Sequence, residues 1–232
     1  MSINYCLISF SSFETKSRNF FKSHIIDSKT SIFNVYELFS STYKMYATEL
    51  RNSTSNLPKD NFKTFGFYNY LIVDGNHLSD ILLDDAVEYS PLPNYLLDLF
   101  KGCCIYAGKG SNSRKYQHIT DAICRLWVCH ANSKPLGKTK QIWDMLQTAK
   151  GVTVLHLLPD CNHYEAHSRE YAIIKALGLV NLSNVYNGTC YGAMTEWNEN
   201  EVVNFGNMIL FNTLKMCLIE TPSHVIFSDL IK

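Results

Sequence analysis

Three short apolar runs constrain the fold of this 232-residue chain more than any other feature. Phe65–Val73 is rich in β-branched and aromatic residues and ends at Asp74-Gly75, and Cys103–Ala107 and Val152–Leu158 are similar runs. Runs of this length between turn residues are typical of buried strands. Apolar residues at helical spacing predict helices from Ser113 to about Cys129 and over Lys138–Ala149, Tyr164–Leu177 and Glu201–Leu218. We therefore expect a small α/β core with helices around a short sheet.

The two ends of the chain differ in character from this core. Residues 1–61 are polar, and within them Ile32, Tyr36, Phe39 and Tyr43 recur at helical spacing before a Ser- and Asn-rich break that starts at Asn52. This spacing predicts an N-terminal helical extension over residues 1–61. Residues 196–232 contain the last predicted helix, and we expect them to form a C-terminal helical tail packed on the core.

The chain has no formal net charge, but its charges are unevenly distributed. Residues 101–150 hold nine Lys and Arg against two Asp, a net charge of +7, and the rest of the chain carries −7. Such asymmetry indicates an anionic partner such as nucleic acid. The alternative is a solvated lysine-rich face, and charge alone does not decide between the two.

No targeting or membrane segment is evident. The start of the chain lacks a basic region, and its apolar stretch, Tyr5–Phe10, is too short for a signal peptide. No run approaches the ~20 apolar residues that a spanning helix needs. We expect no membrane partner and an intracellular protein whose eight cysteines are reduced.

A glycine-containing segment, Gly108-Lys109-Gly110-Ser111, follows the second predicted strand. Backbone N–H groups at such a position can hold a phosphate, although the segment matches neither a Walker A loop nor the G-x-G-x-x-G pattern. Arg114 and His118 follow at i, i+4 and share one helix face, where they could bind a phosphate. A tight turn followed by an ordinary exposed helix is the alternative.

Six short pieces in order resemble one known family. They are Tyr70-Leu71-Ile72-Val73-Asp74, Ile105-Tyr106-Ala107-Gly108-Lys109-Gly110, the spaced set Arg114, Tyr116 and His118, Glu165-Ala166-His167-Ser168-Arg169-Glu170, Leu182-Ser183-Asn184 and Gly188-Thr189-Cys190-Tyr191-Gly192. Residues 62–195 resemble the GIY-YIG endonucleases, and within them the nuclease domain of the animal ankyrin-repeat and LEM-domain endonucleases. The resemblance implies an α/β (α+β) fold with a short, three-stranded, mostly antiparallel sheet flanked by helices. Ala107 departs from the family pattern, which has Ile or Val there.

The resemblance also implies a reaction and roles for individual residues. The reaction is hydrolysis of phosphodiester bonds in branched or duplex DNA, with Mg²⁺ as cofactor and Mn²⁺ as a substitute. Tyr70 matches the general base, Arg114 the residue that stabilises the transition state, and Glu165 the metal ligand. Tyr106, Lys109, His118 and Asn184 complete the expected catalytic set. The DNA contacts are expected from Lys109, Arg114, Lys115, Lys138 and Lys140, and the DNA substrate implies a nuclear protein.

Other interpretations stay open at this point. Glu165 could simply pair with Arg169 at i, i+4 on its helix. Zinc could bind Cys161, His163, His167 and Cys190, although their spacing fits no common ligand pattern. The chain could also keep the fold and bind DNA without cutting it. Oligomeric state is not evident from the sequence.

Overall fold

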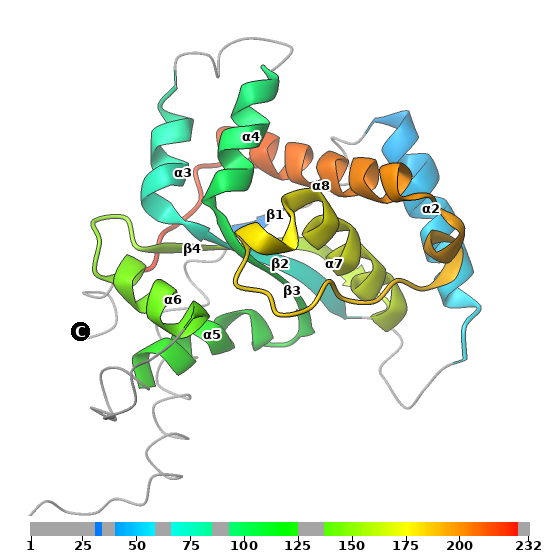
Figure 1. Ribbon diagram of the computed structural model, residues 1–232, viewed down its shortest axis with the longest axis horizontal. Coiled ribbons are helices and arrows are strands. Elements are labelled where there is room, and N and C mark those ends of the chain that lie inside the picture. Colours follow the sequence, from blue (N-terminus) through cyan, green and yellow to red (C-terminus); the bar gives the residue numbers. More distant parts are fainter. Residues whose placement is uncertain (1–30, 34–39, 59–65, 85–92, 125–136, 227–232) are drawn as a thin grey trace, which may run out of the picture.

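The computed structural model describes residues 31–33, 40–58, 66–84, 93–124 and 137–226, and Figure 1 shows their arrangement. Four strands form one sheet in the order β1-β4-β2-β3. The strands are β1 (Ser31–Phe33), β2 (Phe67–Asp74), β3 (Cys104–Ser111) and β4 (Val152–Cys161). Strand β2 is antiparallel to both β3 and β4, and β1 adds a short parallel edge to β4. The expected α/β fold with a three-stranded antiparallel sheet is therefore confirmed.

Seven α-helices surround the sheet in the described part of the chain. They are α2 (Ser41–Ser55), α3 (Gly75–Leu82), α4 (Asn94–Cys103), α5 (Arg114–Ile123), α6 (Lys138–Leu146), α7 (His163–Leu177) and α8 (Glu199–Ile219). Two 3₁₀ turns, η5 (Leu179–Asn181) and η6 (Gly192–Glu196), lie between α7 and α8. Helix α7 ends at Gly178 as expected, with a φ of +78° that favours glycine.

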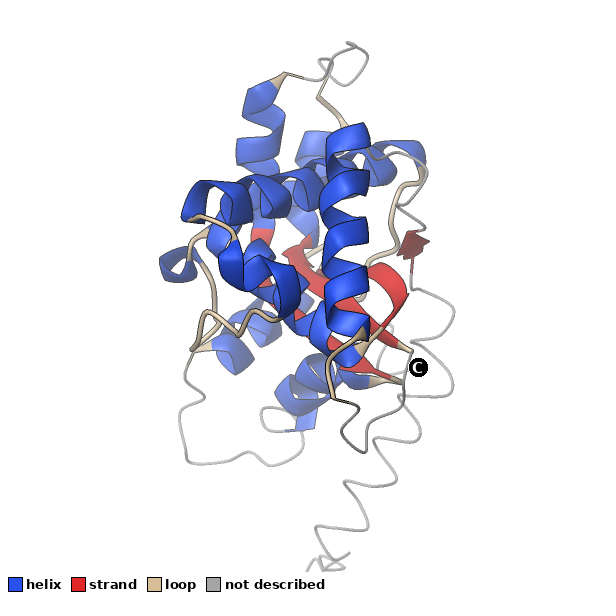
Figure 2. Ribbon diagram, turned by 90° about the vertical axis from the view of Figure 1, so that its right-hand side faces the viewer, coloured by secondary structure: helices blue, strands red, loops and turns tan. Residues whose placement is uncertain are grey.

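Alternation along β2 divides the interior into two cores, because successive side chains of a strand point to opposite faces. Leu71 and Val73 pack in a large core with α2, α4, α7 and α8. Tyr70 and Ile72 pack on the other face with α5 and α6. Figure 2 shows the strands enclosed between helices on both sides.

Two predictions about local structure were wrong. Ile32 lies in β1 and not in a helix, because Ser31–Phe33 pairs with β4; residues 34–39 lie outside the described residues. Gly108-Lys109-Gly110 is not a loop but part of β3, where it pairs with Tyr68–Tyr70 of β2. A phosphate cradle of loop N–H groups is therefore not formed there. Helix α5 is described over Arg114–Ile123, and the rest of the helix expected as far as Cys129 falls largely in residues 125–136, which are not among those described.

Helix α8 is longer and more apolar than the sequence alone suggested. Its 21 residues are enough, by length and composition, to cross a membrane. Half of its most apolar stretch is buried within the protein, where Phe205, Ile209 and Leu214 belong to the large core. Gly206 lies so close to α7 that a Cβ atom there would be 2.2 Å from the carbonyl oxygen of Ala172. These contacts account for the apolar character of α8 as that of a core helix.

Candidate active site

Tyr70 and Gly108 face each other across β2 and β3 at the centre of the candidate site. A Cβ atom at Gly108 would lie 2.5 Å from Cζ of Tyr70 and 2.8 Å from Cε1 of Tyr106. Both distances are far shorter than van der Waals contact, so any larger residue would displace the rings. With glycine there, the centroids of the two tyrosine rings are 6.0 Å apart.

Helix α5 brings His118 and Arg114 to the same place. Nε2 of His118 lies 3.1 Å from Oη of Tyr70, and the imidazole packs edge-on against Tyr106 with centroids 4.6 Å apart. The helix starts close to β3 because Gly110 has no side chain; a Cβ atom there would lie 2.8 Å from Cβ of Arg114. Four residues predicted for the site therefore come together through two glycines of β3.

The environment of these groups fixes their protonation. Burial, followed by the neighbouring Tyr106, raises the pKa of Tyr70 well above its ordinary value, although Arg114 opposes the shift. Burial lowers the pKa of His118 to about 3, and the charges of Lys138 and Arg114 add to this effect. Lys138 itself lies 3.9 Å above the ring centroid of Tyr106. At neutral pH a phenol therefore faces an uncharged imidazole, which suits a hydrogen bond from Tyr70 Oη to His118 Nε2.

Glu170 is the acidic residue that faces this cluster. Its Oε2 lies 3.2 Å from Nζ of Lys109, and its side chain is 12% exposed. Its charge adds to burial in raising the pKa of both Tyr70 and Tyr106. Burial also raises the pKa of Glu170, while Lys109 and Arg114 favour the ionised form.

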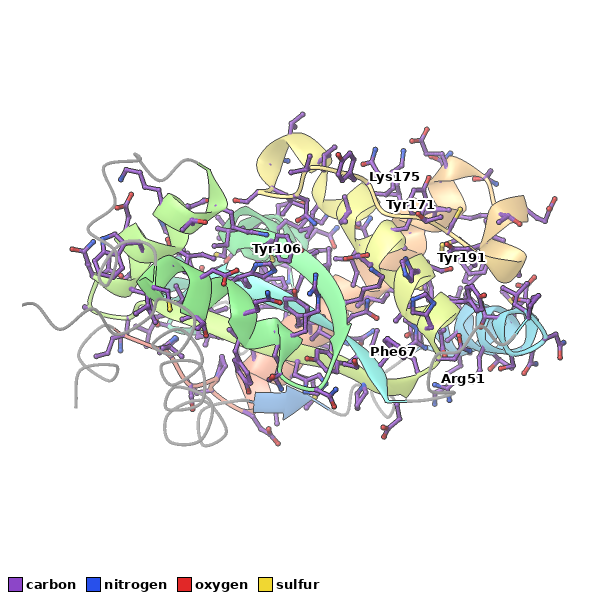
Figure 3. The ribbon with its side chains drawn as sticks, turned by 90° about the horizontal axis from the view of Figure 1, so that it is seen from below. Arg51, Phe67, Tyr106, Tyr171, Lys175 and Tyr191 are labelled. Atoms are coloured by element: carbon purple, nitrogen blue, oxygen red, sulfur yellow. The ribbon has the colours of Figure 1, made fainter. Side chains whose placement is uncertain are left out.

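Glu165 has different surroundings. Its side chain has no exposed surface and contacts Nη2 of Arg169 on the same helix and Nε of Arg51 on α2, the latter at 3.2 Å. Figure 3 shows Arg51 well apart from Tyr106. The carboxylate expected to bind the metal is thus paired with two arginines. The pairing with Arg169 is the alternative role that the sequence had left open for Glu165.

These surroundings decide which carboxylate suits a divalent cation. Mg²⁺ takes one or two carboxylates and keeps several waters, so its ligand must be reachable by solvent. Glu170 meets this condition, because its side chain is 12% exposed and its described ion pair is with Lys109. Glu165 does not, because two guanidinium groups already neutralise a side chain with no exposed surface.

Asn184 holds the outer edge of the sheet beside the tyrosines. Its Oδ1 accepts from the N–H of Ala107 at 3.1 Å, and its Nδ2 donates to the carbonyl of the same residue at 2.8 Å. The N–H of Ser183 donates to the carbonyl of Ile105 at 2.8 Å. Asn184 thus lies at the site as expected, where its side chain fixes the strand that carries Tyr106 and Gly108.

The cations expected to contact DNA fall into two groups. Lys109, Arg114 and Lys138 border the tyrosine cluster, as described above. Lys140 lies farther along α6 in a short ion pair with Asp144, and its side chain is 56% exposed. Lys115 is buried, with Nζ 2.9 Å from Nδ1 of His156 and close to two tyrosine rings. Because its ammonium group points into the protein, Lys115 has a structural position that does not suit contact with DNA.

The four residues considered for zinc do not form a site. Among the described residues, no group of three or more His, Cys, Asp or Glu is placed to hold a metal ion. His163 and His167 contact each other through Nε2 at 3.2 Å, whereas Sγ of Cys161 donates to the carbonyl of Phe67. Burial raises the pKa of Cys161 to about 12, so the thiol is a poor ligand.

Glu170 is the residue that sequence reasoning missed, although a signal was present. Glu165 and Glu170 are five positions apart and therefore point to different faces of a helix. Arg169 lies at i, i+4 from Glu165 and can neutralise it, which leaves Glu170 as the acidic residue of this segment for another role.

This fold and this cluster define the class of protein. The chain belongs to the LEM-3-like GIY-YIG domain family, whose model matches residues 67–232. Membership supports a nuclease role with DNA as substrate, and GIY-YIG nucleases are generally dependent on divalent metal.

Individual relatives carry this domain within longer chains. Over 158 residues the chain is 30% identical to human ankyrin repeat and LEM domain-containing protein 1, a match that covers 66% of this chain and 25% of that protein. The mouse protein of the same name is 29% identical, and the Caenorhabditis elegans homolog is 27% identical over 139 residues. The matches cover 66% and 59% of this chain and 28% and 20% of those proteins. The chain spans about a quarter of the length of these relatives, and no solved structure matches it.

Proposed function

We propose that the chain is a metal-dependent endonuclease that hydrolyses phosphodiester bonds in branched or otherwise distorted DNA. One observation carries the proposal: Oη of Tyr70 lies 3.1 Å from Nε2 of His118, with Arg114 and Glu170 near enough for their charges to shift the pKa of Tyr70. A proton acceptor, a cation and a carboxylate thus meet at one point of the sheet edge.

The contact between Tyr70 and His118 gives the proton of the attacking water a path. A phenol with a raised pKa is a weak base by itself, because it keeps its proton at neutral pH. Tyr70 can instead take the water proton at Oη while its own proton passes to Nε2 of His118. A bound phosphate would favour this transfer, because its negative charge offsets the Lys138 and Arg114 charges that lower the pKa of His118.

The remaining groups provide positive charge around the phosphate. Arg114 can donate two hydrogen bonds to phosphate oxygens, and Lys109 and Lys138 flank it on either side of the tyrosines. One good donor of this kind contributes about 3–4 kcal/mol to transition-state stabilisation. A divalent cation, Mg²⁺ or Mn²⁺ as a substitute, would polarise the scissile phosphate and stabilise the leaving oxygen when bound. We propose Glu170, in place of Glu165, as the residue that holds it.

The experiment is incubation of the full chain with labelled duplex, flap and four-way-junction DNA, with and without Mg²⁺. We expect Mg²⁺-dependent cleavage that is faster on the branched substrates. Glu170→Gln should abolish cleavage and leave DNA binding and the melting temperature close to wild type. Glu165→Gln is the matched control on the same helix, and it should lower the melting temperature because it removes the negative charge that pairs with Arg51 and with the buried guanidinium group of Arg169. Undiminished cutting by Glu170→Gln would refute the metal assignment.

A second function has one observation in its favour. Burial raises the pKa of Tyr70, so its phenol keeps its proton at neutral pH and can donate a hydrogen bond to a phosphate without acting as a base. Such a module would shift the mobility of DNA in a salt-dependent way and leave every substrate intact at all Mg²⁺ concentrations. The same incubation therefore distinguishes the two functions.

A further inference from the structure

Two large apolar side chains next to Asn184 are nearly fully exposed. Val185 is 76% exposed and Tyr186 is 80% exposed, and the three residues that follow are exposed as well. Single exposed apolar residues are common on protein surfaces. A neighbouring pair directly beside a candidate active site is a stronger observation, because loops held by a rigid scaffold commonly carry binding residues.

The segment 185–189, here called the exposed loop, is held at both ends. On one side, Asn184 makes two hydrogen bonds to the backbone of Ala107. On the other side, the N–H of Tyr191 donates to Oγ of Ser168 at 2.7 Å, and that hydroxyl donates back to the carbonyl of Tyr191 at 3.2 Å. Within the loop, Gly188 adopts a φ of +82° and lies against Tyr171 of α7. The loop is therefore anchored to β3 and to α7, and the exposure of Val185 and Tyr186 is fixed by these anchors.

The position of the loop determines what it could contact. Ala107 lies between Tyr106 and Gly108, so Asn184 adjoins the point where the scissile phosphate is proposed to bind. The Cα atom of Tyr186 is at most about 7.6 Å from that of Asn184, since consecutive Cα atoms are ~3.8 Å apart. A nucleotide whose phosphate binds at the tyrosines would therefore have its sugar and base within reach of the exposed loop.

The side chains of the exposed loop suit contact with the base of a nucleotide better than contact with its phosphate. The groups that suit a phosphate, Lys109, Arg114 and Lys138, all lie on β3, α5 and α6. Val185 and Tyr186 carry no charge, and a tyrosine ring stacks well on the face of any base. In a regular duplex both faces of a base are covered, so stacking needs a base that is unpaired or a step that is open, as at a branch point.

We propose that Tyr186, supported by Val185, stacks on an unpaired base next to the cleaved phosphate and so selects branched DNA over regular duplex. This inference rests on the proposed nuclease function and adds the residues that select its substrate. It requires only a base with an open face, so a sequence preference is not expected from it.

The test measures binding without metal, in EDTA, so that it does not depend on cleavage. The DNA is a flap with 2-aminopurine as the unpaired nucleotide at the branch, and a fully paired duplex is the comparison. Tyr186→Ala should weaken flap binding roughly 5- to 150-fold, the range for loss of one base–aromatic stack, and remove the 2-aminopurine fluorescence change. Tyr186→Phe should behave like wild type, and Val185→Ser should weaken flap binding less than Tyr186→Ala does, because Val185 supports the ring and does not itself stack. Binding of the fully paired duplex should change less than about twofold in these variants, because both faces of each base are already covered there.

Leu83→Ala is the matched control, because Leu83 is 81% exposed and lies beside α3, away from the exposed loop in sequence. It should leave flap binding unchanged. Equal flap affinity of Tyr186→Ala and wild type would overturn the inference, as would an equal loss on flap and duplex. In either case, Mg²⁺-dependent cleavage by the wild-type chain would leave the nuclease function standing, whereas a chain that neither binds nor cuts any DNA would remove both proposals.

Discussion

Gly108→Ala is the sharpest perturbation of the site that the structure offers. The added Cβ atom would lie 2.5 Å from Cζ and 2.6 Å from Oη of Tyr70. Ordinary contact begins near 3.4 Å, so the ring must withdraw by about 0.9 Å. Tyr70 is 1% exposed and packed against α5, so this movement must change the position of its hydroxyl relative to His118.

The expected cost can be divided between stability and activity. Overpacking a well-filled interior by one methyl group costs about 1–3 kcal/mol of unfolding free energy. Misplacing a reacting group by about 1 Å can cost 100-fold in rate, which corresponds to ~2.7 kcal/mol of activation free energy. We therefore expect Gly108→Ala to lose at least about 100-fold in cleavage rate on a flap substrate while its binding of flap DNA stays within a few-fold of wild type.

Two other glycines provide graded controls. A Cβ atom at Gly102 would have no heavy atom within 4 Å, so Gly102→Ala should leave the rate unchanged. At Gly110 the nearest atoms are the Cβ and Cγ of Arg114, at 2.8 and 3.1 Å; Cγ can rotate away, but Cβ moves only with the first turn of α5. Gly110→Ala should therefore have an intermediate effect. The assay is single-turnover cleavage in Mg²⁺, with thermal unfolding of each variant. A folded Gly108→Ala protein that cuts at the wild-type rate would refute the argument that the glycine positions Tyr70.

Three further predictions concern stability and dynamics. Asn184→Ala removes two hydrogen bonds to the β3 backbone, so amide exchange at that edge should accelerate and the unfolding free energy should fall by about 2 kcal/mol. Arg51→Ala should cost about 1–2 kcal/mol in urea unfolding, less than for a fully buried pair, because Arg51 is 41% exposed and Glu165 keeps its second arginine. Burial, then the charge of Lys115, lowers the pKa of His156 to about 4, so the unfolded chain binds the proton more readily below pH 6.5. The contribution of His156 to stability should therefore fall by at most about 1.4 kcal/mol per pH unit from pH 6.5 towards 4, and the unfolding free energy should decrease less steeply with falling pH in His156→Gln than in wild type.

The strands and helices that local pattern could predict are those whose signals lie within a few residues. Phe65–Val73 and Val152–Leu158 are apolar and end at Gly or Pro, and they correspond to β2 and β4. β1 could not be found this way, because its three residues become a strand only by pairing with β4, more than 120 positions away. Spacing between Ile32 and Tyr43 fits a helix equally well, so the local pattern predicted the wrong element.

The sequence predicted which residues belong to the candidate site better than it predicted how they are arranged. Tyr70, Tyr106, Arg114 and His118 were expected together, and the structure places them together. Their convergence depends on β3 continuing through Gly108 and Gly110, residues that normally weaken a strand. The strand persists there because the absent side chains are replaced by the rings of β2 and the first turn of α5. Propensity alone predicts a turn at that point.

The edge position of β3 explains how groups from both faces of the sheet could act on one phosphate. Tyr70 and Tyr106 lie on the face covered by α5 and α6, whereas Lys109 pairs with Glu170 of α7, which packs on the opposite face. β3 is the last strand of the sheet, and the described hydrogen bonds of Ser183 and Asn184 to its backbone are at Ile105 and Ala107. A DNA backbone that approaches along Gly108–Gly110 would meet no side chain from the glycines and could contact the tyrosines on one side and Lys109 on the other. Gly108 and Gly110 thus have two effects on the site. They make room for the tyrosine and arginine side chains within the protein, and they place no side chain of their own in the path of a DNA backbone along β3.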